Sequence, residues 1–176
     1  YGKIKSPHKE TDECNPKSFY SRAKFLATSH LIRLYNKHSF PFTVLRLYQA
    51  YGEKQDINRL IPIVITSCIK DKQFPCSEGK QFRDFIHVKD VVGAIIKSIR
   101  QKKSKGQIFN LGSGKLIQIK KLIIFIRNKI GKGEPLFGQI GLRNEESLKV
   151  YPEIKKIKNF LNWKPKILLK SGINNS

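Results

Sequence analysis

The sequence predicts an α/β fold with a parallel sheet. Short apolar runs rich in β-branched residues alternate with stretches whose apolar residues recur at helical spacing. Breakers such as Gly, Pro, Asn and Asp separate these segments. Strands that alternate with helices indicate parallel pairing, because each crossover places a helix on a face of the sheet. With 176 residues and 39% hydrophobic content, the chain can form one ordinary domain, or parts of two, around a real core.

The first half of the chain begins with a loop and continues with a long helix. Residues 1–16 are polar and contain glycine and prolines, which favours a loop. Ser18 is a good helix cap, and apolar residues recur at helical spacing as far as His38. A β-branched strand at 42–47 extends towards Tyr51. The other elements expected here are a helix at 60–69, which Pro62 can open from its first turn, a short strand at 73–76 and a strand at 81–87.

The second half repeats the alternation of helix and strand. A helix beginning at residues 88–90 has apolar side chains at helical spacing up to Ile99 and ends in a basic turn. A strand at 106–112 then runs into the glycine turn Gly112-Ser113-Gly114. The elements expected after this turn are an extended piece at 115–119, a helix at 120–130, a loop with a short strand at 131–142, a helix at 153–161 and a frayed tail at 171–176.

Tyr20 and Lys24 stand four residues apart, just inside the first predicted helix. Residues at i and i+4 share a helix face, so the phenol and the ammonium can point into one site. A lysine cation beside a tyrosine favours the phenolate and lowers the pKa of the phenol from about 10. The pair can therefore act as an acid/base near neutral pH. The alternative is an amphipathic helix with a solvated lysine, because this spacing also arises by chance in a lysine-rich chain.

The formal charge of +22 suggests a nucleic-acid partner, but the distribution of the charge does not support one. Lys accounts for 27 of the 35 basic residues, and these are scattered along the whole chain. The sequence contains no basic region interleaved with stacking aromatics, no zinc-finger spacing and no RNA-recognition signature. We therefore expect no nucleic-acid partner. Attraction to anionic small molecules such as nucleotides fits the charge equally well.

Cysteine and histidine usage predicts a cytoplasmic protein without a metal site. The three cysteines are odd in number and fit no metal-ligand spacing, which favours reduced thiols. The four histidines are dispersed, and we assign none of them a catalytic role. Because no apolar run reaches the roughly 18–20 residues that a membrane span needs, we expect no membrane partner.

A series of motifs follows a fixed order along the chain. Tyr1-Gly2 comes first, followed by the Tyr20/Lys24 pair. The later motifs are Leu45-Arg46-Leu47-Tyr48-Gln49-Ala50-Tyr51-Gly52, Leu60-Ile61-Pro62, Gln81-Phe82-Arg83-Asp84-Phe85-Ile86-His87-Val88-Lys89-Asp90-Val91, Phe109-Asn110-Leu111-Gly112-Ser113-Gly114, Arg143 and Leu161-Asn162-Trp163-Lys164-Pro165. From residue 1 to about 172, this series resembles the C-terminal half or more of the extended short-chain dehydrogenases that act on nucleotide sugars, the NAD-dependent epimerase/dehydratase family.

The resemblance implies the C-terminal part of a Rossmann-type parallel sheet plus a small α/β substrate domain. Residues 1–56 and 84–113 would form a partial NAD(P)-binding domain, and residues 57–83 and 114–176 a nucleotide-sugar-binding domain. The implied cofactor is NAD or NADP, and the implied partner is a nucleoside-diphosphate sugar. The full-length protein is implied to be a homodimer formed through the Tyr20 helix.

The resemblance also implies roles for the residues at the reacting end of the site. Tyr20 would be the acid/base on a sugar hydroxyl, most often O4, and Lys24 would bind the nicotinamide ribose and favour the phenolate. Leu47, Tyr48 and Gln49 would line the cofactor and sugar site. The sugar carbon passes hydride to the nicotinamide while Tyr20 takes the hydroxyl proton. The ketone so formed is shared by epimerases and 4,6-dehydratases, and reductases run this step in reverse.

Two arginines are implied to hold the nucleotide diphosphate. Arg83 matches the first and Arg143 the second, and a guanidinium fork pairs with phosphate oxygens in a directed way. The alternatives are ion pairs, with Asp84 or a nearby carboxylate for Arg83 and with Glu145 or Glu146 for Arg143.

Four further positions are implied to contact the substrate. Arg59 and Leu60 fall where the family lays its chain against the nucleotide base. Cys76 stands where several relatives have an aromatic residue that stacks on the base, so the identity of the base stays open. Gln49 stands where many relatives have Asn, which alters the contact with the sugar diphosphate.

Several features of the family are missing from this sequence. No Gly-x-x-Gly-x-x-Gly occurs, and Gly112-Ser113-Gly114 follows the wrong strand and lacks a third glycine and an acidic partner. The Ser/Thr that polarises the sugar hydroxyl and the Asp-Glu pair of dehydratases are expected upstream of Tyr1. We therefore expect an N-terminally truncated chain that binds NAD poorly and is inactive by itself.

Two alternative functions stay open at this stage. The variants Leu-Tyr-Gln-x-Tyr-Gly and Phe-Pro-Cys-Ser-x-Gly are similar to nucleotide-sugar 4-ketoreductases such as CDP-abequose or paratose synthases. The other alternative is a non-catalytic basic binding module, either with RNA as its partner or as a degenerate scaffold.

Overall fold

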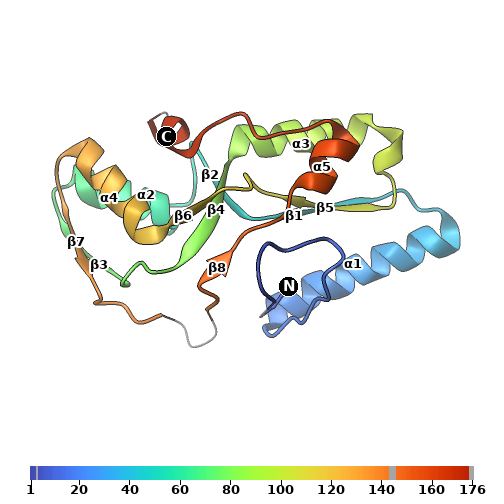
Figure 1. Ribbon diagram of the computed structural model, residues 1–176, viewed down its shortest axis with the longest axis horizontal. Coiled ribbons are helices and arrows are strands. Elements are labelled where there is room, and N and C mark those ends of the chain that lie inside the picture. Colours follow the sequence, from blue (N-terminus) through green and yellow to red (C-terminus); the bar gives the residue numbers. More distant parts are fainter. Residues whose placement is uncertain (3, 143–145, 175–176) are drawn as a thin grey trace.

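The computed structural model describes residues 1–2, 4–142 and 146–174, and it confirms the α/β prediction. Its elements are α1 (Phe19–His38), β1 (Thr43–Leu47), β2 (Gln49–Tyr51), α2 (Leu60–Ile69), β3 (Gln73–Cys76), β4 (Phe82–His87), α3 (Val88–Arg100), the 3-10 helix η1 (Lys102–Ser104), β5 (Gln107–Leu111), β6 (Leu116–Gln118), α4 (Ile119–Ile130), β7 (Glu134–Phe137), β8 (Lys149–Val150), α5 (Lys155–Leu161) and α6 (Leu169–Asn174). Strands cross the middle of the molecule, with α3 and α5 above them and α1 below (Figure 1). The α2–α4 helix pair and the β3–β7 strand pair form a lobe at one end (Figure 1).

The strand predicted over 42–51 is divided in two at Tyr48 because the chain changes its pairing partner there. Upstream, β1 pairs in parallel with β5, with Leu45 opposite Phe109. Downstream, β2 pairs in parallel with β4, with Ala50 opposite Ile86. Between them the Tyr48 backbone N–H donates to the Leu111 carbonyl at 3.0 Å. The chain therefore leaves the carboxyl end of β1 at Tyr48, and ligands of open α/β sheets bind beyond such strand ends.

The buried side chains form two clusters. One lies between β4, α2 and α4 and contains Val64, Phe85 and Leu122. The other lies between β5, α3 and α5 and contains Phe109, Ile157 and Trp163. The division into two domains stays a prediction. However, Ile157 and Trp163 share a cluster with β5, which lies on the other side of the boundary predicted at residue 114.

The chain end is more ordered than predicted. We expected a frayed tail over 171–176, but residues 171–174 belong to α6, and residues 175–176 lie outside the described part. Ile173 is 5% exposed because α6 packs on the β2–β4 region, where the Tyr51 hydroxyl donates to the Leu169 carbonyl at 3.5 Å. Burial raises the pKa of Tyr51 to about 12.

Helix α1 begins at the predicted cap but packs differently from the other long helices. The Ser18 hydroxyl accepts from the Ser21 N–H at 3.2 Å, and the Ser21 hydroxyl accepts from the Ser18 N–H at 3.1 Å. Although Leu26 and Leu31 follow the predicted apolar spacing, every residue of α1 keeps some exposure in the described part of the chain. Among the described residues, no helix combines the length and the apolar character that crossing a membrane requires.

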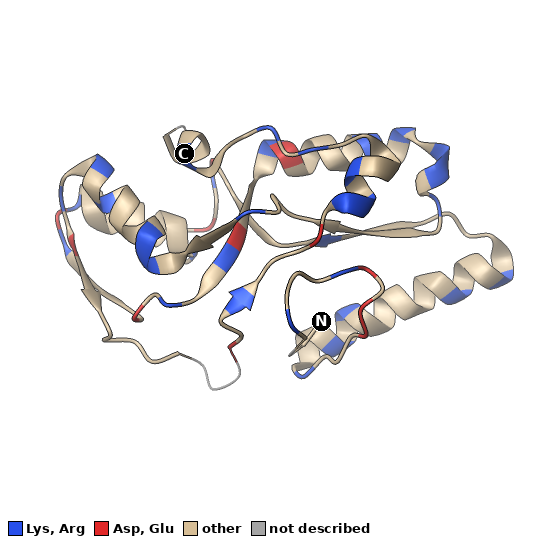
Figure 2. Cartoon of the chain, viewed as in Figure 1, with Lys and Arg blue, Asp and Glu red and all other residues tan. Residues whose placement is uncertain are grey.

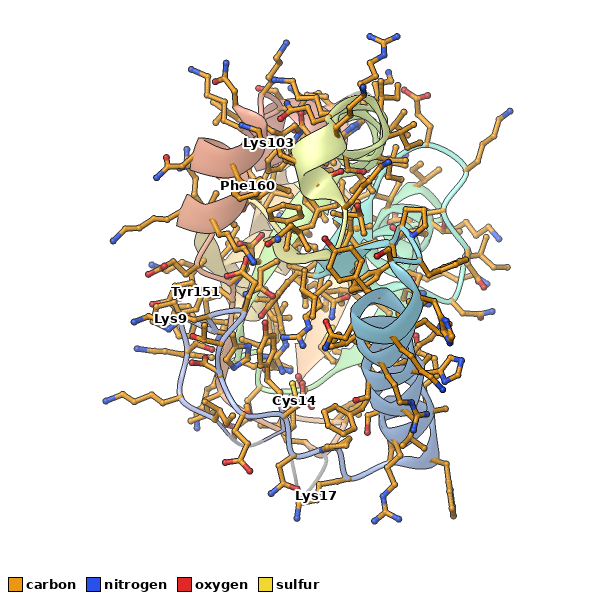
Figure 3. The ribbon with its side chains drawn as sticks, turned by 90° about the vertical axis from the view of Figure 1, so that its right-hand side faces the viewer. Lys9, Cys14, Lys17, Lys103, Tyr151 and Phe160 are labelled. Atoms are coloured by element: carbon orange, nitrogen blue, oxygen red, sulfur yellow. The ribbon has the colours of Figure 1, made fainter. Side chains whose placement is uncertain are left out.

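Basic residues are distributed over helices, strands and loops at both ends of the molecule (Figure 2). Several of them lie on aromatic rings rather than in one patch. Lys103 Nζ, for example, is 5.3 Å from the centroid of the Phe160 ring (Figure 3). This distribution agrees with the scatter of Lys and Arg along the sequence.

Candidate active site

The Tyr20/Lys24 pair lies in the first turns of α1, where the Ser18–Ser21 capping box fixes the start of the helix. Lys24 Nζ is 5.5 Å from the centroid of the Tyr20 ring, so the two side chains share one helix face as the spacing predicted. Tyr20 is 73% exposed. A phenol in this position can meet a ligand that approaches from outside the chain.

A cleft of about 590 Å³ separates the start of α1 from the carboxyl end of β1. The predicted site residues Tyr20, Lys24, Leu47, Tyr48, Gln49 and Arg59 all line it. Cys14, from the N-terminal loop, lines it as well, and its side chain lies between that loop and α1 (Figure 3). Thus six positions predicted from separate motifs surround one cavity of the size that ligand sites usually have.

A second cavity of about 370 Å³ adjoins the first, because Gln49 lines both. It contains the remaining described positions that were predicted to contact substrate, Leu60, Cys76 and Arg83. Its walls are otherwise largely apolar. Burial raises the pKa of the Cys76 thiol, so this side chain is a small neutral group in the wall.

Arg83 is held from two sides. Its Nη1 donates to the carbonyls of Phe82 at 2.8 Å, Ser147 at 3.0 Å and Leu148 at 3.4 Å. Its Nη2 forms an ion pair with Glu146. The structure therefore contains the ion pair that the sequence left open as an alternative, with Glu146 as the partner instead of Asp84.

Asp84 has a different role, which the sequence did not reveal. Its carboxylate accepts from the backbone N–H of Ser113 at 2.7 Å and of Gly114 at 2.6 Å. The side chain is fully buried, and burial raises its pKa against the opposing effect of these hydrogen bonds. Asp84 thus anchors the glycine turn that follows β5 to β4, the strand that also carries Arg83.

Tyr1, His8 and Arg46 also line the cleft and were not among the predicted site positions. Tyr1 and Arg46 belong to the ordered series of motifs, so the sequence could have indicated both of them. His8 stands in a polar loop and had no such signal, since only folding brings it to β1. Arg143 lies outside the described residues. The described part of the chain has no group of three or more His, Cys, Asp or Glu that could hold a metal ion.

The residues of the first cleft fit one end of a nicotinamide cofactor. The cleft opens beyond the carboxyl end of β1, which is where parallel α/β sheets bind dinucleotides. Lys24 offers a cation for ribose hydroxyls, Leu47 offers apolar surface and Tyr48 offers the face of an aromatic ring. The glycine-rich turn that would hold the pyrophosphate is not in this sequence. The fit therefore concerns the nicotinamide end alone.

Comparison with known proteins gives a consistent result. The model of the NAD dependent epimerase/dehydratase family matches residues 1–112. A putative UDP-glucose 4-epimerase of Methanocaldococcus jannaschii is 34% identical over 174 residues, covering 95% of this chain and 54% of the relative. CDP-abequose synthase of Salmonella typhimurium is 31% identical over 145 residues, covering 78% of this chain and 48% of the relative.

Solved structures agree with the sequence relatives. The UDP-glucose 4-epimerase of Thermotoga maritima with UDP-glucose superimposes with a TM-score of 0.90 at 25% identity. The match covers 98% of this chain and 57% of that one. The chain thus spans about half the length of the curated relatives and of this solved structure.

Proposed function

The chain belongs to the NAD-dependent epimerase/dehydratase family, and we propose that it forms the proton-transferring and substrate-binding part of an enzyme acting at C4 of a nucleoside-diphosphate sugar. Family membership confirms the resemblance seen in the sequence, and the family is one of NAD-dependent enzymes. The particular reaction, the substrate and the roles of the residues are part of this proposal.

The observation that carries the proposal is the pair of adjoining cavities joined at Gln49. One contains an acid/base pair, Tyr20 and Lys24, and the other contains the arginine Arg83 in a largely apolar setting. A nucleotide sugar has the matching arrangement, with a reactive sugar at one end, an anionic diphosphate in the middle and a flat base at the other end.

At the reacting end, Tyr20 moves a proton and Lys24 supports it. The Tyr20 phenolate takes the proton of the O4 hydroxyl, and the Lys24 ammonium favours the phenolate and binds the nicotinamide ribose. Leu47, Tyr48 and Gln49 position the cofactor and the sugar against this pair. Bound NAD(P) supplies the hydride-accepting group for the sugar carbon.

At the nucleotide end, Arg83 pairs with the diphosphate. Three backbone carbonyls already hold its Nη1, so the guanidinium is oriented before substrate arrives. Without substrate, the Glu146 carboxylate pairs with Nη2. When substrate binds, a phosphate oxygen takes the position of this carboxylate. Leu60 lies against the base and Cys76 stands at its face. Arg59 lines the first cleft and contacts the substrate from there, and Arg143 is the second arginine of the diphosphate site.

A 4-ketoreductase is the second candidate function. It is favoured by the 31% identity to CDP-abequose synthase. The same Tyr20/Lys24 pair would then give a proton to a C4 ketone. Assaying the whole protein with a nucleotide-linked 4-keto sugar and NADPH distinguishes a reductase from an epimerase or a dehydratase, because only the reductase consumes NADPH.

Nucleotide binding tests the proposal on the 176-residue chain itself. UDP, dTDP and CDP are titrated by calorimetry into the wild type, Arg83→Ala and the exposed control Arg33→Ala. Charge-assisted hydrogen bonds predict an affinity about ten- to a hundredfold lower for Arg83→Ala with the best nucleotide, and no change for Arg33→Ala. Equal affinities for all three proteins, or no binding of any nucleotide, would refute the proposal.

A further inference from the structure

His8 and Tyr48 form a hydrogen-bonded pair in the wall of the cleft that contains Tyr20. His8 Nδ1 lies 2.8 Å from the Tyr48 hydroxyl. His8 is 3% exposed, whereas Tyr48 is partly exposed. The histidine is therefore almost fully buried, whereas the tyrosine keeps accessible surface in the wall of the cleft.

The surroundings of His8 determine which of its nitrogens carries the proton. Nε2 lies 3.1 Å from the Ile4 carbonyl and 3.3 Å from the Ser6 hydroxyl. A carbonyl only accepts, so Nε2 carries hydrogen. Burial lowers the pKa of His8, which favours the neutral ring. In that ring Nδ1 is an acceptor, and the Tyr48 O–H donates to it.

This arrangement turns Tyr48 into a fixed acceptor. Its only proton is committed to His8, so the lone pairs of the phenol oxygen remain for a ligand in the cleft. Burial raises the pKa of Tyr48, so the group stays a neutral hydroxyl. Tyr48 thus differs from Tyr20, whose proposed task is to give and take a proton.

A second set of hydrogen bonds keeps the loop that carries His8 in place. Arg46 Nη1 donates to the Tyr1 hydroxyl at 2.8 Å, and the Tyr1 hydroxyl donates to Asn110. Asn110 Nδ2 donates to the His8 carbonyl at 2.9 Å, and its backbone N–H donates to the Glu10 carboxylate at 2.7 Å. The loop is therefore tied to β1 and β5 at several points, and His8 cannot easily turn away from Tyr48.

We propose that the Tyr48 hydroxyl, oriented by His8, accepts a hydrogen bond from one hydroxyl of the substrate sugar. The site then favours a nucleoside-diphosphate hexose over the deoxyhexose that lacks this hydroxyl, since the deoxy compound leaves the acceptor unpaired. This inference rests on the proposed function, because it takes the ligand to be a nucleotide sugar. His8 acts as a positioning residue and does not touch the ligand.

The test compares hexose with deoxyhexose binding. The 176-residue chain is titrated with UDP, UDP-glucose and the 2-, 3-, 4- and 6-deoxy analogues, or with the equivalent series on whichever nucleotide binds best. One analogue is expected to bind about three- to tenfold more weakly than the parent hexose. In Tyr48→Phe this difference disappears, while the affinity for the free nucleotide is unchanged.

Variants of His8 separate positioning from folding. His8→Gln keeps an acceptor for the Tyr48 O–H, so the preference for the hydroxylated sugar is retained. His8→Leu removes that acceptor, and the preference falls. The double variant His8→Leu, Tyr48→Phe removes both polar partners and provides a second test if a single variant fails to fold.

Two results would overturn the inference while leaving the proposed function intact. They are equal binding of the hexose and all four deoxy analogues, and a preference that survives in Tyr48→Phe. If neither nucleotide nor nucleotide sugar binds, and Arg83→Ala has no effect, the proposed function fails and this inference fails with it.

Discussion

Helix α1 and strand β4 carry the two ends of the proposed site, and they are built in opposite ways. All 20 residues of α1, Tyr20 and Lys24 among them, keep some exposure in the described part of the chain. In β4, every residue after Phe82 is buried, and Arg83 and Asp84 are held by backbone groups from other segments. The nucleotide end of the proposed site, at Arg83, is thus buried in the core. The reacting end, at Tyr20 and Lys24, lies on a helix that has no buried residues among those described and whose start is fixed by a capping box.

The exposed apolar side chains of α1 extend this difference. Phe19 is 91% exposed and Leu26 64%, although apolar groups on a helix normally face a core. Contiguous exposed apolar surface marks a contact site. The homodimer through this helix stays a prediction, and these side chains are where such a contact would form.

The largest difference is expected between leucines in the core and on α1. Leu122 is fully buried between α4 and α2, so Leu122→Ala should lower the free energy of unfolding by about 2–5 kcal/mol. Leu26→Ala removes the same atoms from an exposed site and should cost less than about 0.5 kcal/mol. Urea denaturation of both variants measures the difference, and equal losses would show that α1 is packed after all.

Removal of the Asp84 carboxylate should have the next largest effect. Asp84→Ala leaves the N–H groups of Ser113 and Gly114 without their acceptor, which should cost about 2–3 kcal/mol. Asp71 makes a similar bond to the Gly133 N–H at 2.9 Å but is exposed, so Asp71→Ala serves as the control. The control should lose less than about 1 kcal/mol, because water can replace the missing acceptor. A loss of comparable size in both variants would contradict the anchoring role.

His8 should make stability depend on pH. Because burial lowers its pKa, the protonated ring is disfavoured in the folded state, and the stability present above about pH 6.5 is lost as the pH falls through the folded pKa. In His8→Gln the free energy of unfolding should fall less steeply as the pH is lowered below about 6.5. The slopes of wild type and variant should differ by up to about 1.4 kcal/mol per pH unit. Urea midpoints measured between pH 7 and 5 test this, and parallel curves would contradict it.

The smallest effect is expected at the cap of α1. Ser18→Ala removes an N-cap bond that is usually worth about 1 kcal/mol, but α1 can open without unfolding the core. Hydrogen exchange should therefore be about fivefold faster in the first turn of α1, the fold-change that this energy implies. The amides of β4 should keep their rates. Faster exchange in both elements would mean that α1 and the core unfold together.

The elements that depend on local pattern could be predicted from the sequence. Helix α2 spans the predicted residues 60–69, and α1 begins directly after the predicted cap Ser18. The break at Tyr48 could not be predicted, because it arises where the chain changes from pairing with β5 to pairing with β4, and both partner strands are distant in sequence. Helix α6 depends in the same way on its contact with Tyr51.

The candidate site shows the same limit. The motifs led to nine of the residues that line the two cavities, because each motif is a short run that can be read locally. The partners of these residues are non-local: Glu146 lies 63 positions from Arg83, and His8 lies 40 positions from Tyr48. Spacing along the chain contains no information about such pairs.

In the proposed function, Tyr20 transfers the proton of the sugar hydroxyl. Turnover of a nucleotide sugar by Tyr20→Phe, with Tyr35→Phe as the control, tests this central claim most directly. Both changes remove one hydroxyl from the same helix, and the assay uses the whole protein with NAD(P). Loss of an acid/base group should lower kcat by about 10²–10⁴-fold in Tyr20→Phe, with unchanged nucleotide-sugar affinity and unfolding midpoint. Tyr35→Phe should keep its activity. Turnover by Tyr20→Phe within a few-fold of the wild type would contradict the account.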